Sequence, residues 1–293
     1  MIRSDTNSTS FAISITLLGY LCFIIQDSSI KWLSTDVVVL QILFVRGLFA
    51  LGFLVVGAGI SGNTLTLKCD RPWLMLLRTL TNVVSWGFFF YGLKYLPLAT
   101  ATALFFSFPI YLTALSIPLL GEKSGIRRWS AMLVGFIGVV LMTKPGAEFQ
   151  WSALLMICAA LGWASVAIMT RKLSDHSNAS SMLFHTLIGF AITLAIPQFW
   201  VWQSLSIEQF SMIAIAAFFG VIAQLCLVKA YSIERPSVIA PFEYSGLVWA
   251  AVFGFLIWND VPDWVVLLGA ALIVGSNIYI TRREALLSNP NIS

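Results

Sequence analysis

Apolar residues follow one another along most of this chain in stretches of about twenty, and short polar segments separate the stretches. A helix that crosses the hydrocarbon core of a bilayer needs roughly 20 mostly apolar residues. The pattern predicts ten membrane-spanning helices over residues 11–31, 37–58, 73–93, 98–119, 129–144, 151–170, 181–202, 209–230, 237–258 and 264–281. We therefore predict an all-α integral membrane protein with little chain left for a soluble domain.

Composition supports this class. Of the 293 residues, 59% are hydrophobic and only 10% are charged, whereas charged residues make up about a quarter of a soluble domain. The first apolar stretch is as long as a full span and no A-x-A-like cleavage site follows, so we interpret it as a retained helix. Three of the four cysteines fall inside spans, which favours packing roles over a disulfide framework.

Basic residues predict the orientation. With a cytoplasmic N-terminus, twelve lysines and arginines lie at cytoplasmic ends of the spans, and Lys31, Lys94 and Lys144 lie on the other side. Positive residues are enriched in cytoplasmic loops. We expect both termini in the cytoplasm and an even number of spans.

Ten spans divide into two halves of five, which would have opposite orientations if they are copies. The segment FSFPIYLTALSIPLLGE resembles EYSGLVWAAVFGFLIWND in hydropathy, and a glycine-rich apolar span follows each. Identities at this shift of 138 residues are few, among them Ser107 with Ser245. Inverted repeats around a central site are typical of secondary transporters.

The two segments PLATATALFFSFPIYLTALSIPLLGEKSGIRRWSAMLVGFIGVVLMTKPG and ERPSVIAPFEYSGLVWAAVFGFLIWNDVPDWVVLLGAALIVGSNIYI resemble the two EamA repeats of the drug/metabolite transporter superfamily. The stretch LRTLTNVVSWGFFFYGLKYLPLATATAL is similar to the branch of bacterial riboflavin and S-adenosylmethionine uptake carriers, which also has amino-acid and metallophore exporters. The resemblance implies a tail over 1–10, repeats over 11–145 and 146–283, and a tail over 284–293. Asn259 and Asp260 depart from the Gly-Glu of the family pattern.

Four ionisable residues lie within spans, where each costs about 2.5 to 3.5 kcal/mol. With a helical rise of about 1.5 Å per residue, Asp27 and Arg46 fall at a similar depth in the membrane, and Arg78 and Glu243 fall at another. Each pair is geometrically feasible. Alternatively, Asp27 pairs with Lys31 and Arg78 reaches headgroups. Arg46 lies near the midplane, so it faces a polar cavity, braces a carboxylate, or only locks two helices together.

Glu243 stands in PFEYSG, where a proline and a glycine interrupt an apolar run. Irregular backbone at membrane depth is tolerated only where protein or a watery cavity satisfies it. We expect Glu243, with Tyr244, to bind a polar or cationic part of a solute or to take up a coupling proton. The rival interpretation is a permanent bond to Arg78 or to backbone.

Aromatic side chains are abundant. Six tryptophans near span ends fit interface anchors: Trp32, Trp73, Trp129, Trp151, Trp202 and Trp264. Deeper candidates for the lining of a cavity are Trp86, Tyr111 and Trp163, with hydrogen-bonding companions Gln26, Ser107 and Gln224. The alternative is that these residues face lipid or only pack the bundle.

Motifs for enzymatic chemistry are absent from the sequence, including H-E-x-x-H, G-x-S-x-G and the Walker motif. We expect no enzyme, no cofactor and no metal site. The sequons at Asn7, Asn178 and Asn291 fall on the expected cytoplasmic side, where glycosylation does not occur.

The sequence therefore predicts a secondary transporter in a bacterial inner membrane. It would move a small organic metabolite by alternating access, either riboflavin-like, S-adenosylmethionine-like or an amino acid. Expected partners are this solute and the lipid bilayer, with no nucleic acid, and a homodimer is left open. A non-transporting scaffold or regulatory subunit is the alternative. A channel is less favoured because no charged ring is visible.

Overall fold

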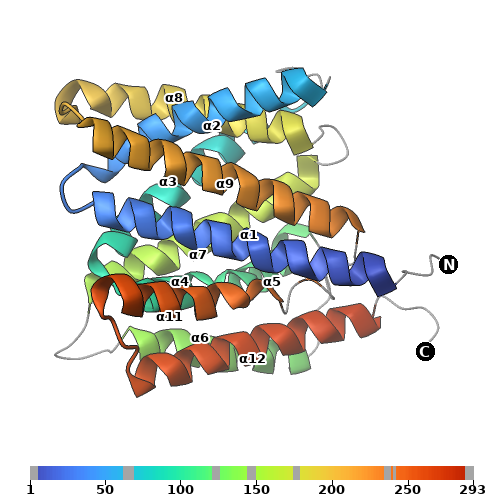
Figure 1. The fold of residues 1–293 in the computed structure, drawn as a ribbon. Coiled ribbons are helices and arrows are strands. Elements are labelled where there is room, and N and C mark those ends of the chain that lie inside the picture. Colours follow the sequence, from blue (N-terminus) through green and yellow to red (C-terminus); the bar gives the residue numbers. More distant parts are fainter. Residues whose placement is uncertain are drawn as a thin grey trace.

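The computed structural model describes residues 6–61, 69–120, 126–143, 150–173, 179–233, 239 and 242–287. Within these ranges every regular element is a helix (Figure 1), which confirms the all-α class. Several residues used in the sequence predictions lie outside the described ranges: Arg3, Lys68, Glu122, Lys123, Lys144, Asn178, Arg235, Pro241 and Asn291.

The helices follow the apolar stretches of the sequence. They are α1 (Thr6–Leu33), α2 (Val39–Ser61), α3 (Pro72–Tyr95), α4 (Leu98–Phe105), α5 (Phe108–Leu120), α6 (Ile126–Met142), α7 (Trp151–Leu173), α8 (Ala179–Val201), α9 (Ile207–Ile233), α11 (Ser245–Trp258) and α12 (Trp264–Leu287). Within the described part of the chain, six helices are long and apolar enough to cross a membrane, and three shorter ones are also apolar. The protein is therefore a multi-pass membrane protein.

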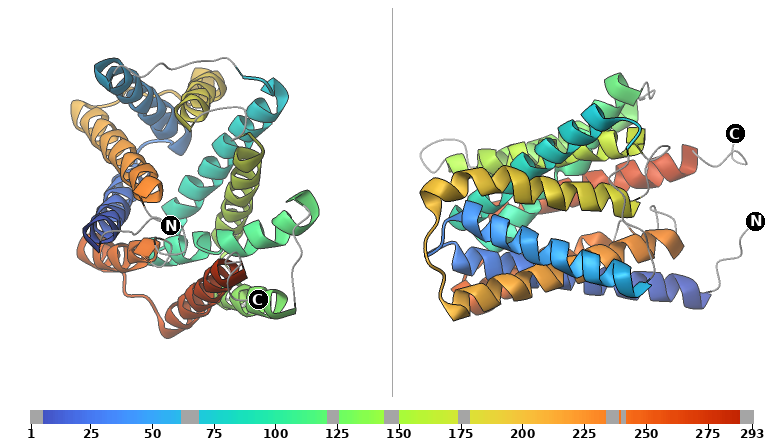
Figure 2. Two further views of the ribbon diagram at one scale, coloured as in Figure 1. Left: turned by 90° about the vertical axis from the view of Figure 1, so that its right-hand side faces the viewer. Right: turned by 90° about the horizontal axis from the view of Figure 1, so that it is seen from above.

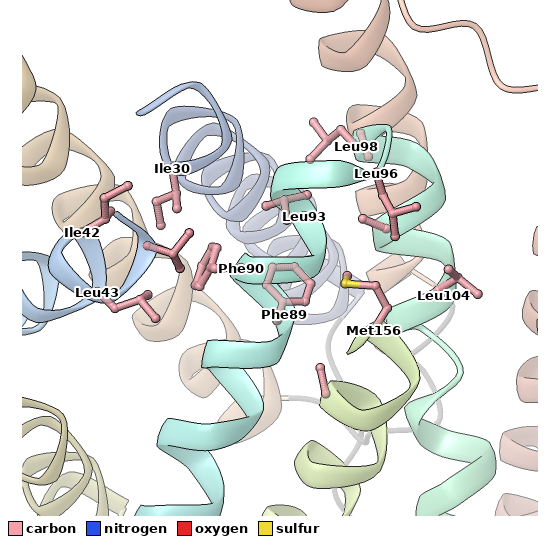
Figure 3. Close-up of a cluster of buried hydrophobic side chains, with 14 of the residues drawn as sticks. Ile30, Ile42, Leu43, Phe89, Phe90, Leu93, Leu96, Leu98, Leu104 and Met156 are labelled. Atoms are coloured by element: carbon pink, nitrogen blue, oxygen red, sulfur yellow. The ribbon is translucent and has the colours of Figure 1, made fainter. Parts of the chain in front are cut away.

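The helices pack as antiparallel pairs that join the two halves of the sequence. α1 lies along α9, α3 along α7, α2 along α8 and α6 along α12, and the views in Figures 1 and 2 agree on these neighbours. α1 begins and α12 ends at the same end of the bundle, called here the terminal end. The buried core lies between the halves, and Figure 3 shows Ile30 of α1, Ile42 of α2, Phe90 of α3 and Met156 of α7 within it.

The predicted fourth span is divided at Phe106 and Ser107 into α4 and α5. Pro109 explains the division, because it has no N–H to donate to the carbonyl of Phe105, one turn earlier. Ser107 closes the last turn of α4 by donating its hydroxyl to the Leu104 carbonyl at 2.6 Å. The Asn277 amide of α12 donates to the Phe106 carbonyl at 2.8 Å. The break is therefore held by protein groups rather than exposed to lipid.

The second half has a matching interruption. α11 has only 14 residues and begins at Ser245, 138 residues after Ser107. Tyr244 is the N-cap of α11, and the centroid of its ring lies 5.3 Å from the centroid of the Phe106 ring. The two interruptions thus meet in the interior of the bundle.

Asn259 ends α11 in the left-handed conformation, with φ of 56°. Its N–H caps the carbonyls of Gly254 and Phe255. Glycine is the commonest residue at such helix ends and asparagine the usual substitute. This geometry accounts for Asn259 at a position where the family pattern has glycine.

The six tryptophans predicted as interface anchors lie near helix ends, and their side chains are between 45% and 81% exposed. Indole rings at these positions suit the boundary between hydrocarbon and headgroups. The anchors therefore mark the two edges of the membrane-embedded part.

Two glycines bring α6 and α12 into backbone contact. A Cβ added at Gly138 would lie 2.7 Å from the Gly269 carbonyl oxygen, and one added at Gly269 would lie 2.8 Å from the Gly138 carbonyl oxygen. Small residues allow this close approach between membrane helices. The pair fixes the crossing point of these two helices.

We expect Gly138→Ala to lower the thermal denaturation midpoint of the detergent-solubilised protein by several degrees, because a backbone oxygen cannot move aside as a side chain can. Gly275→Ala, on α12, is the matched control. Its Cβ would meet nothing within 4 Å, and alanine favours a helix over glycine by about 1 kcal/mol. Equal midpoints for the two variants would contradict the packing described.

Candidate functional site

Arg46 of α2 is bonded to α1 in the interior of the bundle. Its Nη2 donates to Oε1 of Gln26. Gln26 in turn donates through Nε2 to Oδ1 of Asp27 at 2.9 Å. The structure therefore brings Arg46 and Asp27 together, as their depths suggested, with the Gln26 amide between the two charges. Gln26 and Asp27 are both buried.

Lys31 does not pair with Asp27 in the described contacts. Its ammonium group donates to the carbonyls of Leu93, at 3.1 Å, and Leu96 at the last turn of α3. It also lies 5.2 Å from the centroid of the Trp258 ring. Lys31 thus ties α1, α3 and α11 together at the end of the bundle opposite the terminal end.

Gly220 of α9 makes room for this polar cluster. A Cβ at this position would lie 2.0 Å from Oε1 of Gln26 and 3.0 Å from Nη2 of Arg46. The absence of a side chain is therefore required for the observed hydrogen bond. Gly220 was not identified from the sequence. The only signal that pointed to it was a single glycine among the larger apolar residues of this span.

Aromatic rings line the other side of Arg46. Its Cζ lies 5.8 Å from the ring centroids of both Trp86 and Phe90, within the range of cation–π attraction. Trp86 stacks on Phe90 at 5.3 Å and meets Trp163 edge-on at 5.5 Å. Phe105, the last residue of α4, lies 6.5 Å from Trp86. We call Trp86, Phe90, Phe105 and Trp163 the aromatic wall.

Glu243 does not form the bond to Arg78 that was the rival interpretation. Oε2 accepts a hydrogen bond of 2.7 Å from the Tyr20 hydroxyl, so the described partner of Glu243 is Tyr20 and not Arg78. Equal depth did not bring Glu243 and Arg78 together because their helices have different neighbours. α11 packs on α1 and α4, whereas α3 packs mainly on α7 and α8. Sequence reasoning did not identify Tyr20.

Arg78 braces three helices instead. From α3, it donates to Thr170 of α7 at 2.7 Å, to Thr186 of α8 at 2.8 Å and to the Met182 carbonyl at 3.3 Å. The side chain is buried, so it does not extend to headgroups. Its geometry is that of a structural support rather than part of the cluster around Arg46.

Three remaining candidates, Ser107, Tyr111 and Tyr244, lie at or next to the interruptions of the two halves. Tyr244 lies beside Asn277 and Glu243, and the buried Tyr111 hydroxyl has no hydrogen-bond partner among the described residues. Gln224 lies one turn after Gly220 on α9 and is partly buried. The Tyr20 ring, 5.9 Å from Phe106, connects this region to the helix that carries Gln26 and Asp27.

The polar cluster is distinct from an open apolar pocket of about 500 Å³ beside α2 and α9, lined by Phe44, Val45, Leu48, Phe49, Gly52, Phe53, Val56, Trp202 and Phe210. The described part of the chain contains no group of three or more histidine, cysteine, aspartate or glutamate side chains that could hold a metal ion.

Curated relatives carry the names of transporters. The chain is 30% identical over 279 residues to an S-adenosylmethionine uptake transporter of Rickettsia bellii, covering 94% of each. It is 35% identical over 217 residues to a riboflavin transporter of Vibrio cholerae, covering 71% of each. A pseudopaline exporter of Pseudomonas aeruginosa is 24% identical over 274 residues, covering 92% of this chain and 95% of the exporter.

A solved crystal structure shares the fold, with a TM-score of 0.63 at 18% identity over 94% of this chain and 99% of the other. Residues 10–144 and 150–282 each match the EamA-like transporter family. These two matches confirm the resemblance inferred from the paired segments, and the chain belongs to the EamA-like transporter family.

Proposed function

We propose that this protein is a secondary transporter that moves a small organic metabolite with a planar ring across a bacterial inner membrane by alternating access. One observation supports this proposal most directly. Arg46, Gln26 and Asp27 form a charged cluster beside the aromatic wall, deep between the two EamA repeats. Ionisable groups at such depth usually mark a solute or ion pathway.

Exposure supports a hydrated path beside this cluster. Arg46, Trp86, Trp163, Tyr20 and Glu243 all retain partial exposure. Arg46 contacts α1 and α3, and lies beside Gly220 of α9. Partial exposure of a side chain with neighbours on three helices is expected where water enters the bundle.

The proposed architecture has ten spans in two inverted repeats, over 11–145 and 146–283, between tails over 1–10 and 284–293. Helix packing supports this symmetry. If α7 is the copy of α1 and α9 the copy of α3, the pair α1 with α9 corresponds to the pair α7 with α3, and both pairs are present. Broken helices at equivalent positions of two repeats are a common location of transporter binding sites.

Charge supports an orientation with the terminal end in the cytoplasm. Eight basic residues of the described ranges lie at or near the terminal end, and two lie near the other end. They are Arg71, Arg127, Arg128, Arg171, Lys172, Lys229, Arg282 and Arg283, against Lys31 and Lys94. This distribution follows the positive-inside rule.

Purified protein in proteoliposomes is expected to show saturable counterflow of S-adenosylmethionine, riboflavin or an aromatic amino acid. Trp86→Ala should weaken apparent affinity by about five- to a hundredfold, because stacking on an aromatic side chain contributes about 1 to 3 kcal/mol. Trp264→Ala, an exposed anchor at the start of α12, is the matched control and should transport normally. Absence of saturable flux for every solute would refute the transporter proposal and favour a scaffold.

Glu243→Gln is expected to reduce active transport at least tenfold, or to uncouple it from an imposed proton gradient, while the protein remains folded. The amide keeps the size of the side chain but cannot take up a proton. Glu208→Gln in the exposed first turn of α9 is the control, with only a small helix-dipole effect of about 0.3 to 1 kcal/mol. Unchanged, gradient-driven uptake by Glu243→Gln would remove Glu243 from the mechanism.

A further inference from the structure

We propose that Arg46 and Asp27 recognise a zwitterionic amino-carboxylate group on the transported solute, and that the Gln26 amide occupies the place of this group in the structure. The inference rests on the proposed transport function and narrows its substrate class. The solute would carry a carboxylate and an ammonium close together, attached to a planar ring system.

Arg46 is incompletely paired. Nη2 donates to Gln26, but the neighbouring Nε is buried and has no hydrogen-bond partner among the described residues. A guanidinium presents its donors as a rigid fork, and a carboxylate can accept from both prongs. The Gln26 amide has only one oxygen for this edge. Because a buried donor without a partner is unfavourable, the edge is better satisfied by a carboxylate than by the amide it now holds.

The other atom of the Gln26 amide defines the second half of the site. Its nitrogen donates to Asp27. The orientation of this amide follows from its partners, since a guanidinium only donates and a carboxylate accepts. Gln26 thus presents an acceptor to Arg46 and a donor to Asp27. An amino acid presents the same two groups, as a carboxylate and an ammonium on one carbon.

Charge balance favours a zwitterion over a simple anion or cation. Arg46 and Asp27 interact electrostatically across Gln26. A lone anion on Arg46 would add a second negative charge beside Asp27, and a lone cation on Asp27 would add a positive charge beside Arg46. Burying such an uncompensated charge is costly. A zwitterion supplies one opposite charge to each residue and leaves the net charge of the site unchanged.

Aromatic rings lie next to the place that the Gln26 amide occupies. Trp86 and Phe90 flank the Arg46 guanidinium at equal distances, so a ring attached to the bound carboxylate would reach the aromatic wall. Among the solutes in the relatives' names, S-adenosylmethionine combines an amino-carboxylate with a planar ring, whereas riboflavin has a planar ring without an amino-carboxylate.

Wild-type proteoliposomes test this inference with pairs of solutes that differ in one group. The first pair is S-adenosylmethionine and its decarboxylated analogue, and the second is tryptophan and tryptamine. Riboflavin serves as a planar ring compound that has no amino-carboxylate group. We expect saturable counterflow for at least one zwitterion and at least a tenfold loss of apparent affinity when its carboxylate is removed. If riboflavin or the amines are transported as well as or better than the zwitterions, the inference is overturned while the transporter function stands. If no solute is transported, both fail.

Gln26→Glu provides a second test. The new carboxylate should pair with both Nε and Nη2 of Arg46, abolish zwitterion transport and remove the thermal shift caused by the solute. Gln209→Glu is the matched control, because Gln209 and Ser206 form a reciprocal cap at the start of α9 that glutamate also satisfies. Wild-type transport by Gln26→Glu would contradict the inference. If this variant does not fold, the solute pairs on the wild-type protein still decide.

Discussion

The arrangement of this bundle depends on the cost of placing charges and free backbone groups in hydrocarbon. Every such group must find a partner within the protein or in water that the protein encloses. Arg46 meets this requirement only in part, through Gln26 and the adjacent rings, because its Nε has no partner among the described residues. The interrupted fourth span meets it through Asn277. The bond from Asn277 joins the two repeats, and Gly220 of the second repeat lies against Gln26 and Arg46 of the first, so the polar interior and the packing of the two repeats depend on each other.

The helices could be predicted from the sequence because membrane spans depend on local apolar length. The proximity of Asp27 and Arg46 also followed, since both lie on uninterrupted helices whose depth can be counted residue by residue. The alternative of a bond between Arg78 and Glu243 is not formed, because α11 packs on α1 and α4 whereas α3 packs mainly on α7 and α8. Tyr20 and Gly220 were missed because their roles arise only where α1 crosses its neighbours.

The two halves use their interruptions differently. In the first half the chain resumes as α5 after two residues, whereas α11 begins with Tyr244 as its N-cap beside the Phe106 ring. A helix N-terminus carries partial positive charge and free N–H groups. Glu243, which directly precedes this terminus, therefore adds a negative charge close to a dipole of opposite sign. The same residue is bonded to Tyr20 of the first half, so the two repeats share one polar junction.

Lys31 has a further consequence for the opposite end of the bundle. Its ammonium group holds the Leu93 and Leu96 carbonyls and lies against the Trp258 ring. Separation of α1 from α3 at this end would strand a cation and two backbone acceptors at once. These contacts would have to break together, which favours an all-or-none separation of α1 from α3 at this end over a gradual one.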